Sequence, residues 1–464
     1  MSDNHNWPDV ESFVAELRRY EEHPRLKELW NPNAATFLTR APGRLDVMGG
    51  IADYSGSLVL QLPLFEAILV ALQPDESRSV TLVSLSGNRN DDSRVFRMPL
   101  DDFVVNGEAV AYEFAEDYFG RDPSHAWAAY VAGAFLVLMK ERRTQFSKGA
   151  RIFIRSDVPE GKGVASSAAL EVAAMKAIDA AFGLAITPRD LAIYCQKVEN
   201  LVVGAPCGIM DQMSSVFGEA GRLLKLLCQP AELQGTVAIP RELAFFGIDS
   251  GIAHAVSGAD YTTVRAGTFM GYRILQEWAG EDFGGYLANL PPSDFEQHYA
   301  SRLPVTMTGE EFIRRYHRTT DRVTTVEPSV SYSLRQPTAH PIYEHQRLQT
   351  FSELLKGDPM KNAPLLGELM YQSHASYSAC GLGSEGTDRL VELSRAAGPS
   401  KGIYGAKITG GGSGGTVAVL SESDAEETVV SIAQQYADET GYQPYVFTGS
   451  SDGARCFGHR ELKL

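Results

Sequence analysis

Two serines at the start of a helix are the first candidates for chemistry in this sequence. Ser166 and Ser167 follow a turn that contains Gly161 and Gly163. Glycine allows a backbone to approach a ligand closely, and the free N–H groups and positive dipole end at a helix N-terminus attract anions. The turn and the helix therefore indicate an anion site, and the expected anion is phosphate.

Three interpretations compete for this stretch. A dinucleotide-binding fingerprint requires glycine or alanine where Ser166 stands, and a P-loop requires a Gly-Lys-Ser/Thr triplet, which residues 158–176 lack. The third interpretation is a capped helix after a glycine turn, without a ligand, because Gly-x-Gly alone is a weak signal. The stretch by itself leaves the anion site and the capped helix open.

A second glycine-rich segment, residues 42–57, places charged side chains next to apolar strands. It holds Arg44, Asp46 and Asp53. We expect this segment to be a loop, where binding groups tend to lie, although an ordinary turn with solvated charges is the simpler alternative.

Two further carboxylates are candidates. Asp211 lies in an otherwise apolar context, so it needs a partner or a role. Glu199 lies near the end of a helix that Thr187 and Pro188 begin, as cap and first helical residue. A third glycine cluster follows at residues 410–415.

The elements that must position these residues follow from the spacing of apolar residues. Alternation predicts strands over 35–41, 58–72, 79–85, 151–155, 245–250 and 417–420. Helices are predicted over 168–182, 343–355 and 364–375, and Gly183 ends the first of them. The central serines therefore lie between a strand and a long helix.

Composition limits the class of protein. The 464 residues are 44% hydrophobic and 22% charged, which predicts a globular protein of two or three domains. A net charge of −16 argues against nucleic acid or a membrane surface as a partner. Five scattered cysteines without a CxxC pair, and the lack of a signal or membrane-spanning pattern, predict a cytoplasmic location.

Four motifs, in this order, resemble those of the GHMP kinase family and of its galactokinase branch. They are Pro42 to Gly56, Pro159 to Ala168, Cys207-Gly-Ile-Met-Asp-Gln212 and Thr409 to Gly415. The resemblance implies an α+β fold of two domains, the first like domain 2 of ribosomal protein S5 and the second ferredoxin-like. The implied domains are residues 1–240, with the phosphate-binding loop 159–169, and residues 241–464, with a helical insertion at about 280–345.

The resemblance also implies roles for individual residues. Asp211 resembles the catalytic aspartate, with Arg44 as its cationic neighbour, and Ser167 and Glu199 resemble ligands of Mg²⁺. The implied sugar contacts are Asp53, Gly50, Ile51, Asp46, Gly208 and Tyr261. The implied ATP-binding residues are Gly161, Lys162, Gly163, Val164, Ala165, Ser166, Ser167, Ala168, Trp127, Gly411 and Gly412. Asp46 stands where the branch has Asn, and it either touches the sugar or caps the loop.

One departure from the branch bears on the substrate. Galactokinases have Glu-His where this chain has Gly50-Ile51, and that pair faces the exocyclic hydroxymethyl of galactose. L-Arabinopyranose has the ring configuration of galactose without that group. A hydroxymethyl left unpaired beside Ile51 would cost about 1–3 kcal/mol, or roughly tenfold to a hundredfold in selectivity. Residues 43–61 also resemble the kinase domain of the plant L-arabinokinases.

The expected partners are therefore L-arabinose, ATP and Mg²⁺, the expected product is β-L-arabinose 1-phosphate, and the oligomeric state, monomer or homodimer, stays open. Three alternatives remain at this point. They are a galactokinase with an altered pocket, a sensor that binds sugar and ATP without catalysis, and a uronic-acid kinase. A uronic-acid kinase would need a cation near the ring C5 position, which Gly50 and Ile51 do not supply.

Overall fold

Two β-sheets frame the molecule in the computed structural model, which describes residues 7–86, 93–253 and 259–463. The larger sheet has the strand order β16-β1-β2-β7-β3-β4, with β8 paired to β2 and β9 to β8. Its strands are β1 (Thr36–Met48), β2 (Leu58–Asp75), β3 (Ser79–Ser86), β4 (Ser93–Pro99), β7 (Gly149–Ser156), β8 (Arg222–Leu227), β9 (Glu232–Ala238) and β16 (Arg460–Leu462). All neighbouring pairs are antiparallel except β3 and β7.

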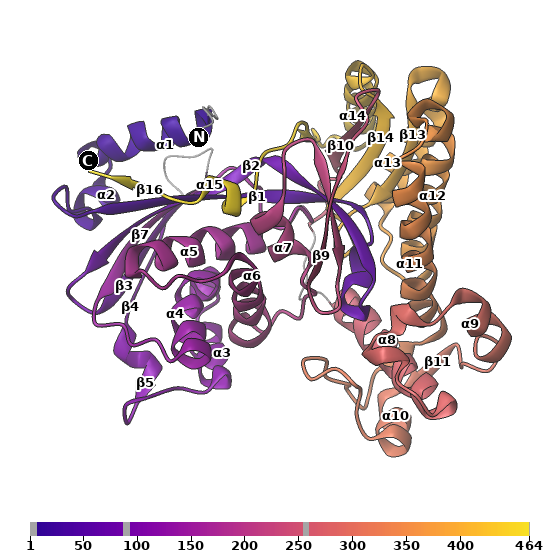
Figure 1. Cartoon of the computed structure of the whole chain (residues 1–464), viewed down its shortest axis with the longest axis horizontal. Coiled ribbons are helices and arrows are strands. Elements are labelled where there is room, and N and C mark those ends of the chain that lie inside the picture. The colour runs from indigo at the N-terminus through magenta and orange to yellow at the C-terminus, as the bar shows by residue number, and fades with distance from the viewer. Residues whose placement is uncertain (1–6, 87–92, 254–258, 464) are drawn as a thin grey trace.

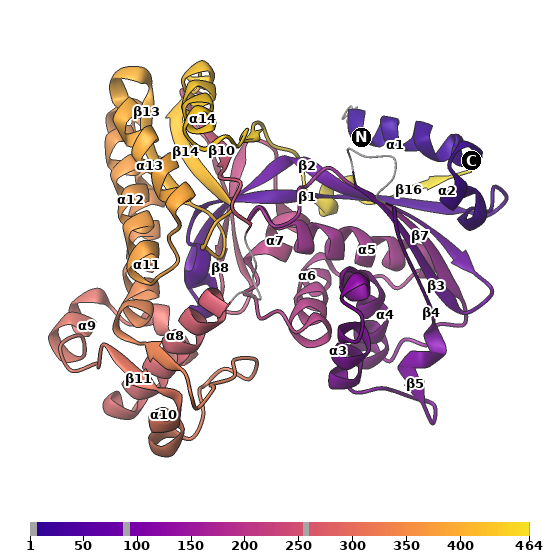
Figure 2. The same cartoon turned by 180° about the vertical axis from the view of Figure 1, so that it is seen from behind.

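Helices cover both faces of this sheet (Figures 1 and 2). One face carries α3 (Tyr112–Gly120), α4 (Ala129–Arg142), α5 (Ser166–Phe182), α6 (Pro188–Lys197) and α7 (Met210–Phe217). The other carries α1 (Pro8–Arg18) and α2 (Pro24–Leu29), and α15 (Ala454–Phe457) lies beside β1. Val10 and Phe13 of α1 pack on Phe153 of β7, with the two rings stacked 5.1 Å apart.

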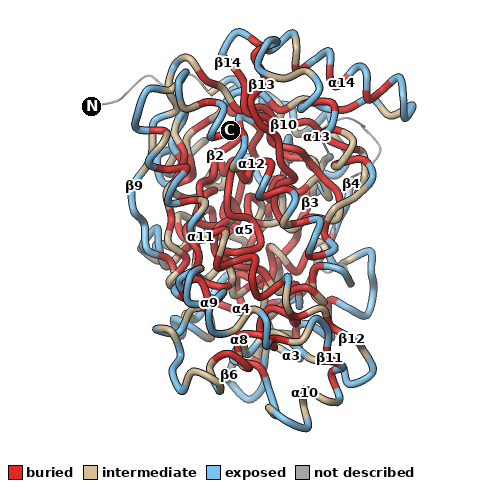
Figure 3. The backbone as a smooth tube through the Cα atoms, turned by 90° about the vertical axis from the view of Figure 1, so that its right-hand side faces the viewer, coloured by how far each residue is buried: buried red, intermediate tan, exposed pale blue. Residues whose placement is uncertain are grey.

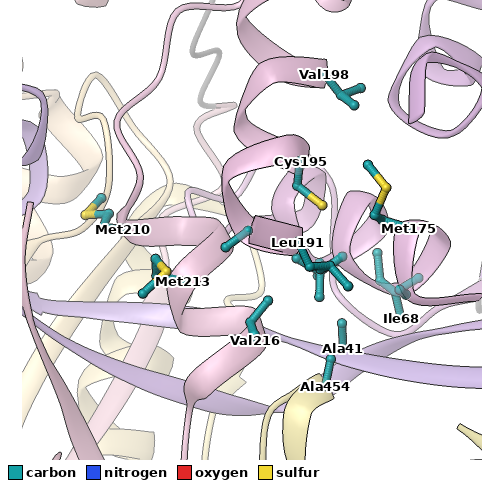
Figure 4. Packing of buried hydrophobic residues seen from close by; sticks show 14 of the residues in the cluster. Ala41, Ile68, Met175, Leu191, Cys195, Val198, Met210, Met213, Val216 and Ala454 are labelled. Atoms are coloured by element: carbon teal, nitrogen blue, oxygen red, sulfur yellow. The ribbon is translucent and has the colours of Figure 1, made fainter. Parts of the chain in front are cut away.

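Helices α5, α6 and α7 pack against one another, and α5 and α7 also pack against the larger sheet. Leu191 and Cys195 of α6 pack against Met175 of α5, while Val216 of α7 approaches Ala41 of β1 (Figure 4). Half of the buried residues of α5 are alanine, and these small side chains allow the close approach. The start of α5 and the start of α7 are therefore fixed against the same sheet.

The smaller sheet has the order β13-β14-β10-β15, all antiparallel. Its strands are β10 (Leu243–Asp249), β13 (Ile403–Ile408), β14 (Thr416–Glu422) and β15 (Val446–Phe447), and α12 (Pro359–Ala379), α13 (Glu385–Ala397) and α14 (Glu426–Thr440) pack with it. On β10, Leu243 and Phe245 belong to the main core, whereas Phe246 and Ile248 belong to a second cluster. The period of two along a strand explains this division.

The long helices α8 (Ala259–Ala279) and α11 (Arg335–Leu354) carry a peripheral lobe. Its short elements are η6 (Phe283–Gly285), η7 (Leu287–Asn289), α9 (Pro292–His298), β11 (Thr306–Thr308), α10 (Gly309–Tyr316) and β12 (Ser331–Ser333). Phe295 and Phe312 share a separate core with Met270 of α8. Figure 3 shows buried backbone along the sheets and α5, and more exposed backbone around α9 and α10.

The remaining described elements are short. They are η1 (Tyr20–Glu22), η2 (Gly50–Ser55), η3 (Leu100–Phe103), η4 (Pro123–Ala128), η5 (Val198–Val203), η8 (Pro399–Lys401) and the hairpin of β5 (Val104–Val105) and β6 (Glu108–Ala109). Across the described residues, the helices include none long and apolar enough to cross a membrane.

The expected strands and helices are present, with two differences. Residues 42–48 are not a loop: β1 continues through them to Met48, because its bulges at Pro42/Arg44 and Asp46/Met48 accommodate the irregular sequence. The expected irregular segment ends early, because α11 begins at Arg335 and holds Pro337 and Pro341. A proline in its first turn is tolerated because that N–H has no helical partner.

Candidate active site

The three glycine-rich segments meet at the backbone of Gly163. Its carbonyl accepts hydrogen bonds from Arg44 Nη1 at 2.6 Å and from Thr409 Oγ1 at 3.0 Å. The neighbouring Lys162 carbonyl accepts one from Thr416 Oγ1 at 2.8 Å. Strand β1, the turn before α5 and the loop between β13 and β14 are thereby joined at one point between the two sheets.

A cavity of about 220 Å³ opens where these segments meet. It is lined by Arg44, Gly50, Ile51, Asp53, Tyr130, Gly161, Gly163, Ala165, Ser166, Ser167, Glu199, Ala205, Cys207, Gly208, Met210, Asp211, Tyr261, Gly410 and Gly411. Glycine carbonyls and amides, one guanidinium and three carboxylates thus face the same space. Such a mixture suits a ligand that carries both phosphate and hydroxyl groups.

The start of α5 forms the side of the cavity where the sequence predicts phosphate, called the phosphate side below. The residue before it, Ala165, has left-handed backbone angles (φ 60°, ψ 45°) and gives the helix no side-chain cap. The first N–H groups of the helix, at Ser166 and Ser167, therefore remain available to an anion. Gly163 in the preceding turn has φ +69°, a conformation that favours glycine.

Arg44 and Asp211 form a bidentate pair at the centre of the cavity. Arg44 Nε donates to Asp211 Oδ1 at 2.8 Å, and Nη2 donates to Oδ2 at 2.9 Å. Arg44 is 2% exposed, while Asp211 is 21% exposed and lies in the first turn of α7. Burial alone would lower the pKa of Arg44, but Asp211 and Asp46 raise it above its ordinary value. The guanidinium is therefore a fixed positive charge beside an accessible carboxylate.

Glu199 lies deeper, on the π-helical turn η5 that follows α6. Gln212 Nε2 donates to Glu199 Oε2 at 2.7 Å and to Glu171 Oε2 at 3.1 Å, and Ser167 also hydrogen-bonds Glu199. Burial and then Asp211 raise the pKa of Glu199 to about 7. A buried carboxylate surrounded by hydroxyl and amide groups is a suitable ligand for a hard cation.

Asp53 and Gly208 face each other on the other side of the cavity. A Cβ added to Gly208 would lie 1.8 Å from Asp53 Oδ2, so only glycine allows this approach. Burial and then Asp211 raise the pKa of Asp53 to about 7, although Arg265 opposes the shift. Tyr261 of α8 lines the same side. These groups can hydrogen-bond the hydroxyls of a small polar ligand.

Several predicted residues lie outside the cavity lining. Asp46 is sealed behind it, where its Oδ2 lies 2.7 Å from Lys407 Nζ and both side chains are 0% exposed. Lys162 points away, toward Asp249 and Tyr442. Trp127 packs against the main core, and Tyr130, one helical turn later, lines the cavity instead. Val164, Ala168 and Gly412 also do not line the cavity.

Sequence reasoning gave no individual role to Lys407, Gln212, Glu171, Tyr130 or Tyr377, although Gln212 ends one of the four motifs. Lys407 stands two residues before the third glycine motif, and a lone lysine in an apolar strand was the available signal for a buried ion pair. Tyr377 lies on α12, and its place in a helical pattern of apolar residues indicates only a core position.

Two family profiles match the chain: the N-terminal domain of GHMP kinases at residues 129–219 and their C-terminal domain at residues 351–438. Galactokinase of Chloroflexus aggregans is 30% identical over 427 aligned residues, covering 91% of this chain and 93% of that protein. The chain belongs to the GHMP kinase family. L-Arabinokinase of Arabidopsis thaliana is 45% identical over an alignment that is 506 residues long and covers 97% of this chain. The alignment covers 49% of the plant protein, so the chain spans about half the length of that relative.

Solved structures share this GHMP kinase fold. Lactococcus lactis galactokinase, determined in complex with galactose, matches with a TM-score of 0.74 at 21% identity, over 98% of this chain and 100% of that one. A mevalonate kinase matches with a TM-score of 0.54 at 14% identity, over 90% and 99%. The two-domain α+β GHMP kinase fold predicted from the sequence is confirmed.

The described acidic residues of this GHMP kinase do not form a closed metal cage. Within residues 7–86, 93–253 and 259–463, no group of three or more His, Cys, Asp and Glu side chains could hold a metal ion. The Ser167 hydroxyl and the Glu199 carboxylate still fit Mg²⁺, because this ion commonly takes one or two protein oxygens and completes its shell with phosphate and water. The donors present therefore suit an ion that arrives with a nucleotide.

Proposed function

We propose that this GHMP kinase transfers the γ-phosphoryl group of ATP to the anomeric hydroxyl of L-arabinose, giving β-L-arabinose 1-phosphate and ADP. The observation that carries the proposal is the wall made by Gly50 and Ile51, which lies in the same cavity as Arg44, Asp53 and Asp211. Ile51 is 2% exposed and offers no side-chain hydrogen bond to a sugar substituent. The 45% identity to the Arabidopsis L-arabinokinase supports the same choice of substrate.

The site residues then act on a sugar hydroxyl. Asp211 accepts a hydrogen bond from the C1 hydroxyl and takes its proton as the O–P bond forms and the bond to the ADP oxygen breaks. Arg44, held by two hydrogen bonds, orients Asp211 and stabilises negative charge on the transferred group. Asp53 and Tyr261 position the ring through its other hydroxyls.

The phosphate side holds the nucleotide. The N–H groups of Ser166 and Ser167 and the Gly161–Gly163 turn receive the phosphates, and the start of α5 favours their negative charge. Ser167 and Glu199 would hold Mg²⁺, which neutralises phosphate charge when bound. Phosphoryl transfer needs mainly positioning and charge stabilisation, and these residues supply both.

We further infer a cytoplasmic location. The cysteines at positions 195, 207, 228, 380 and 456 are free, and four of them are buried. Free thiols are usual in a reducing compartment.

The position of the new phosphate tests the proposal. The protein is incubated with Mg-ATP and L-arabinose, and the product is analysed by ³¹P and ¹H NMR. The expected product has a phosphate coupled to the anomeric proton, in stoichiometric ratio with ADP. Phosphate at another carbon, or ADP that forms equally without sugar, would contradict the proposal.

A further inference from the structure

The space beside Gly50 is filled by a side chain from a distant helix. A Cβ added to Gly50 would lie 1.4 Å from Tyr377 Oη and 2.7 Å from Tyr377 Cζ. Non-bonded heavy atoms in a packed interior do not come this close. Gly50 also has φ +42°, which disfavours other residues. Any side chain at position 50 therefore requires Tyr377 to move.

The Tyr377 hydroxyl connects two walls of the cavity. It accepts a hydrogen bond from the Ile51 N–H at 2.8 Å and donates one to the Gly410 carbonyl at 2.8 Å. Ile51 and Gly410 line the cavity, whereas Tyr377 is fully buried and lies behind them. One hydroxyl thus fixes the sugar-side wall against the third glycine motif.

The surroundings of Tyr377 hold its ring in this place. The His340 ring meets it edge-on at 5.2 Å, and Lys407 Nζ lies 5.4 Å from its centre. Leu382 and Ile408 pack against it in one apolar cluster. A ring enclosed on these sides does not swing away to admit a larger wall residue.

The carboxylate of Asp46 closes the remaining space. Its Oδ2 would lie 2.9 Å from the added Cβ of Gly50, and its Oδ1 accepts from the Gly50 N–H at 3.1 Å and from Gln61 Nε2 at 2.6 Å. Although burial opposes it, Lys407 and Arg44 hold the pKa of Asp46 below its ordinary value. A glutamate side chain at position 50 would meet both an aromatic ring and a like charge.

We propose that Tyr377 is a positioning residue that sets sugar selectivity: it occupies the space of a side chain at position 50 and fixes Ile51 as the wall. The wall then offers no hydrogen bond to an exocyclic substituent, and the site selects pyranoses that lack a hydroxymethyl group. This inference rests on the proposed function in that the ligand is a sugar phosphorylated in this cavity. It predicts that positions 50 and 377 are coupled, although they are 327 positions apart in the sequence.

Four variants test the coupling: Gly50→Glu, Tyr377→Leu, their combination, and Tyr377→Phe. Leucine ends near the depth of the tyrosine Cδ atoms, so it frees the space that the ring end and hydroxyl fill. Initial rates of ADP release give kcat/KM for L-arabinose and for D-galactose. We expect Gly50→Glu alone to lose at least tenfold with both sugars, because the new side chain has no room.

The combined variant should restore D-galactose kcat/KM at least tenfold above Gly50→Glu and reverse the order of the two sugars. Tyr377→Leu alone should reduce the arabinose-to-galactose ratio at least threefold. Tyr377→Phe keeps the ring but removes the hydroxyl that fixes Ile51, so it should reduce the ratio by a smaller factor. Tyr371→Phe on the same helix removes a tyrosine hydroxyl away from the cavity and is the matched control. It should leave the ratio unchanged.

Two results would overturn the inference. One is a gain of galactose activity by Gly50→Glu alone that equals the gain of the combined variant. The other is a wild-type sugar ratio in Tyr377→Leu. If the combined variant does not show a cooperative thermal transition, it is not folded and gives no test. The arabinose-to-galactose ratio of Tyr377→Leu then decides whether the inference stands.

A failure of the proposed function can be distinguished from a failure of this inference. If the wild-type protein phosphorylates a different sugar, the same variants are compared on two sugars. One is that sugar, and the other is the pyranose that differs from it only in the presence or absence of the hydroxymethyl group. Coupling between positions 50 and 377 can then be present although L-arabinose is not the substrate. If L-arabinose is the best substrate but positions 50 and 377 are not coupled, only the role of Tyr377 is overturned.

Discussion

The two sides of the cavity are built in different ways. On the phosphate side, the turn before α5 uses backbone groups and a helix N-terminus within one short segment, residues 159–169. On the sugar side, Ile51 is fixed by Tyr377 from α12, Asp53 faces Gly208, and Tyr261 comes from α8. The first side depends on local backbone conformation, and the second on long-range packing.

This difference separates the side of the cavity that can serve many substrates from the side that selects one substrate. Backbone amides recognise phosphate without regard to the acceptor molecule, so the same turn serves any substrate. Side chains brought together from distant elements determine the shape of the sugar wall. A change of substrate in this fold therefore needs coordinated changes on the sugar side, while the phosphate side can stay as it is.

The largest expected effect is a loss of kcat on substitution of Asp211, which lies between the two sides of the cavity. Asp211→Asn keeps the size of the side chain but removes the carboxylate that Arg44 contacts twice. We expect kcat to fall about 10²–10⁴-fold, with the Kd for sugar changed only a few-fold. Rates of ADP release and calorimetric titration measure the two quantities. A kcat within tenfold of wild type would contradict a catalytic role for Asp211.

The next effect concerns the stability of the sugar side. Lys407→Met leaves the fully buried Asp46 carboxylate without its cation and should reduce the free energy of unfolding by about 3–5 kcal/mol. The control is Lys356→Met, which breaks a solvent-exposed pair with Glu353 and should reduce the free energy of unfolding much less. Urea unfolding compares the two. Equal losses would show that the buried pair is not what holds the wall.

A smaller effect isolates the phosphate side. Gly163→Ala forces alanine to φ +69° and should weaken ATP binding about tenfold, through a strain of about 1–2 kcal/mol. Gly183→Ala places the same strain at the far end of α5, at φ +63° in open space. It should reduce stability without changing the Kd for ATP. Sugar affinity should change in neither variant, and a selective loss of sugar binding in Gly163→Ala would contradict the division of the site.

The smallest effect is a pH dependence on the sugar side. Burial and Asp211 raise the pKa of Asp53 to about 7, so the protonated form grows as the pH falls below 7 and accepts fewer hydrogen bonds. Sugar affinity should rise roughly tenfold between pH 6 and 8. Because the folded pKa is the higher one, the contribution of Asp53 to stability is largest below its ordinary pKa and is lost as the pH rises through about 7.

The variant Asp53→Asn is the control for this titration. It should bind sugar less tightly, and its affinity should not change over the same pH range. Calorimetric titration with sugar at pH 6, 7 and 8 gives the comparison. An equal slope in wild type and Asp53→Asn would assign the pH dependence to another group.

Much of the phosphate side could be predicted from the sequence, because its signals are local. The strand, the glycines, the serines and Gly183 follow one another along the chain, and the structure shows the strand, the turn and the helix in that order. The helix begins two residues earlier than predicted, at Ser166. Local spacing can also mislead: Ser423 and Glu426 have the spacing of a capping box, yet Ala425 precedes α14 without a side-chain cap.

The sugar side could be predicted only in part. Glycine at position 50 and Asp53 stand within a motif, but the reason for glycine is Tyr377, far along the chain. The segment with Arg44 and Asp46 was expected to be a loop because of its glycines, whereas pairing with β2 makes it a bulged strand. Tertiary pairing and packing decide these features, and neither leaves a periodic signal in one sequence.

The most direct measurement compares two sugars that differ in one substituent. Initial rates of ADP release are recorded with L-arabinose and D-galactose at equal concentrations and with Mg-ATP. The Gly50–Ile51 wall predicts a preference for L-arabinose of roughly tenfold to a hundredfold. An equal or faster rate with D-galactose would contradict the claim that this wall selects against the hydroxymethyl group.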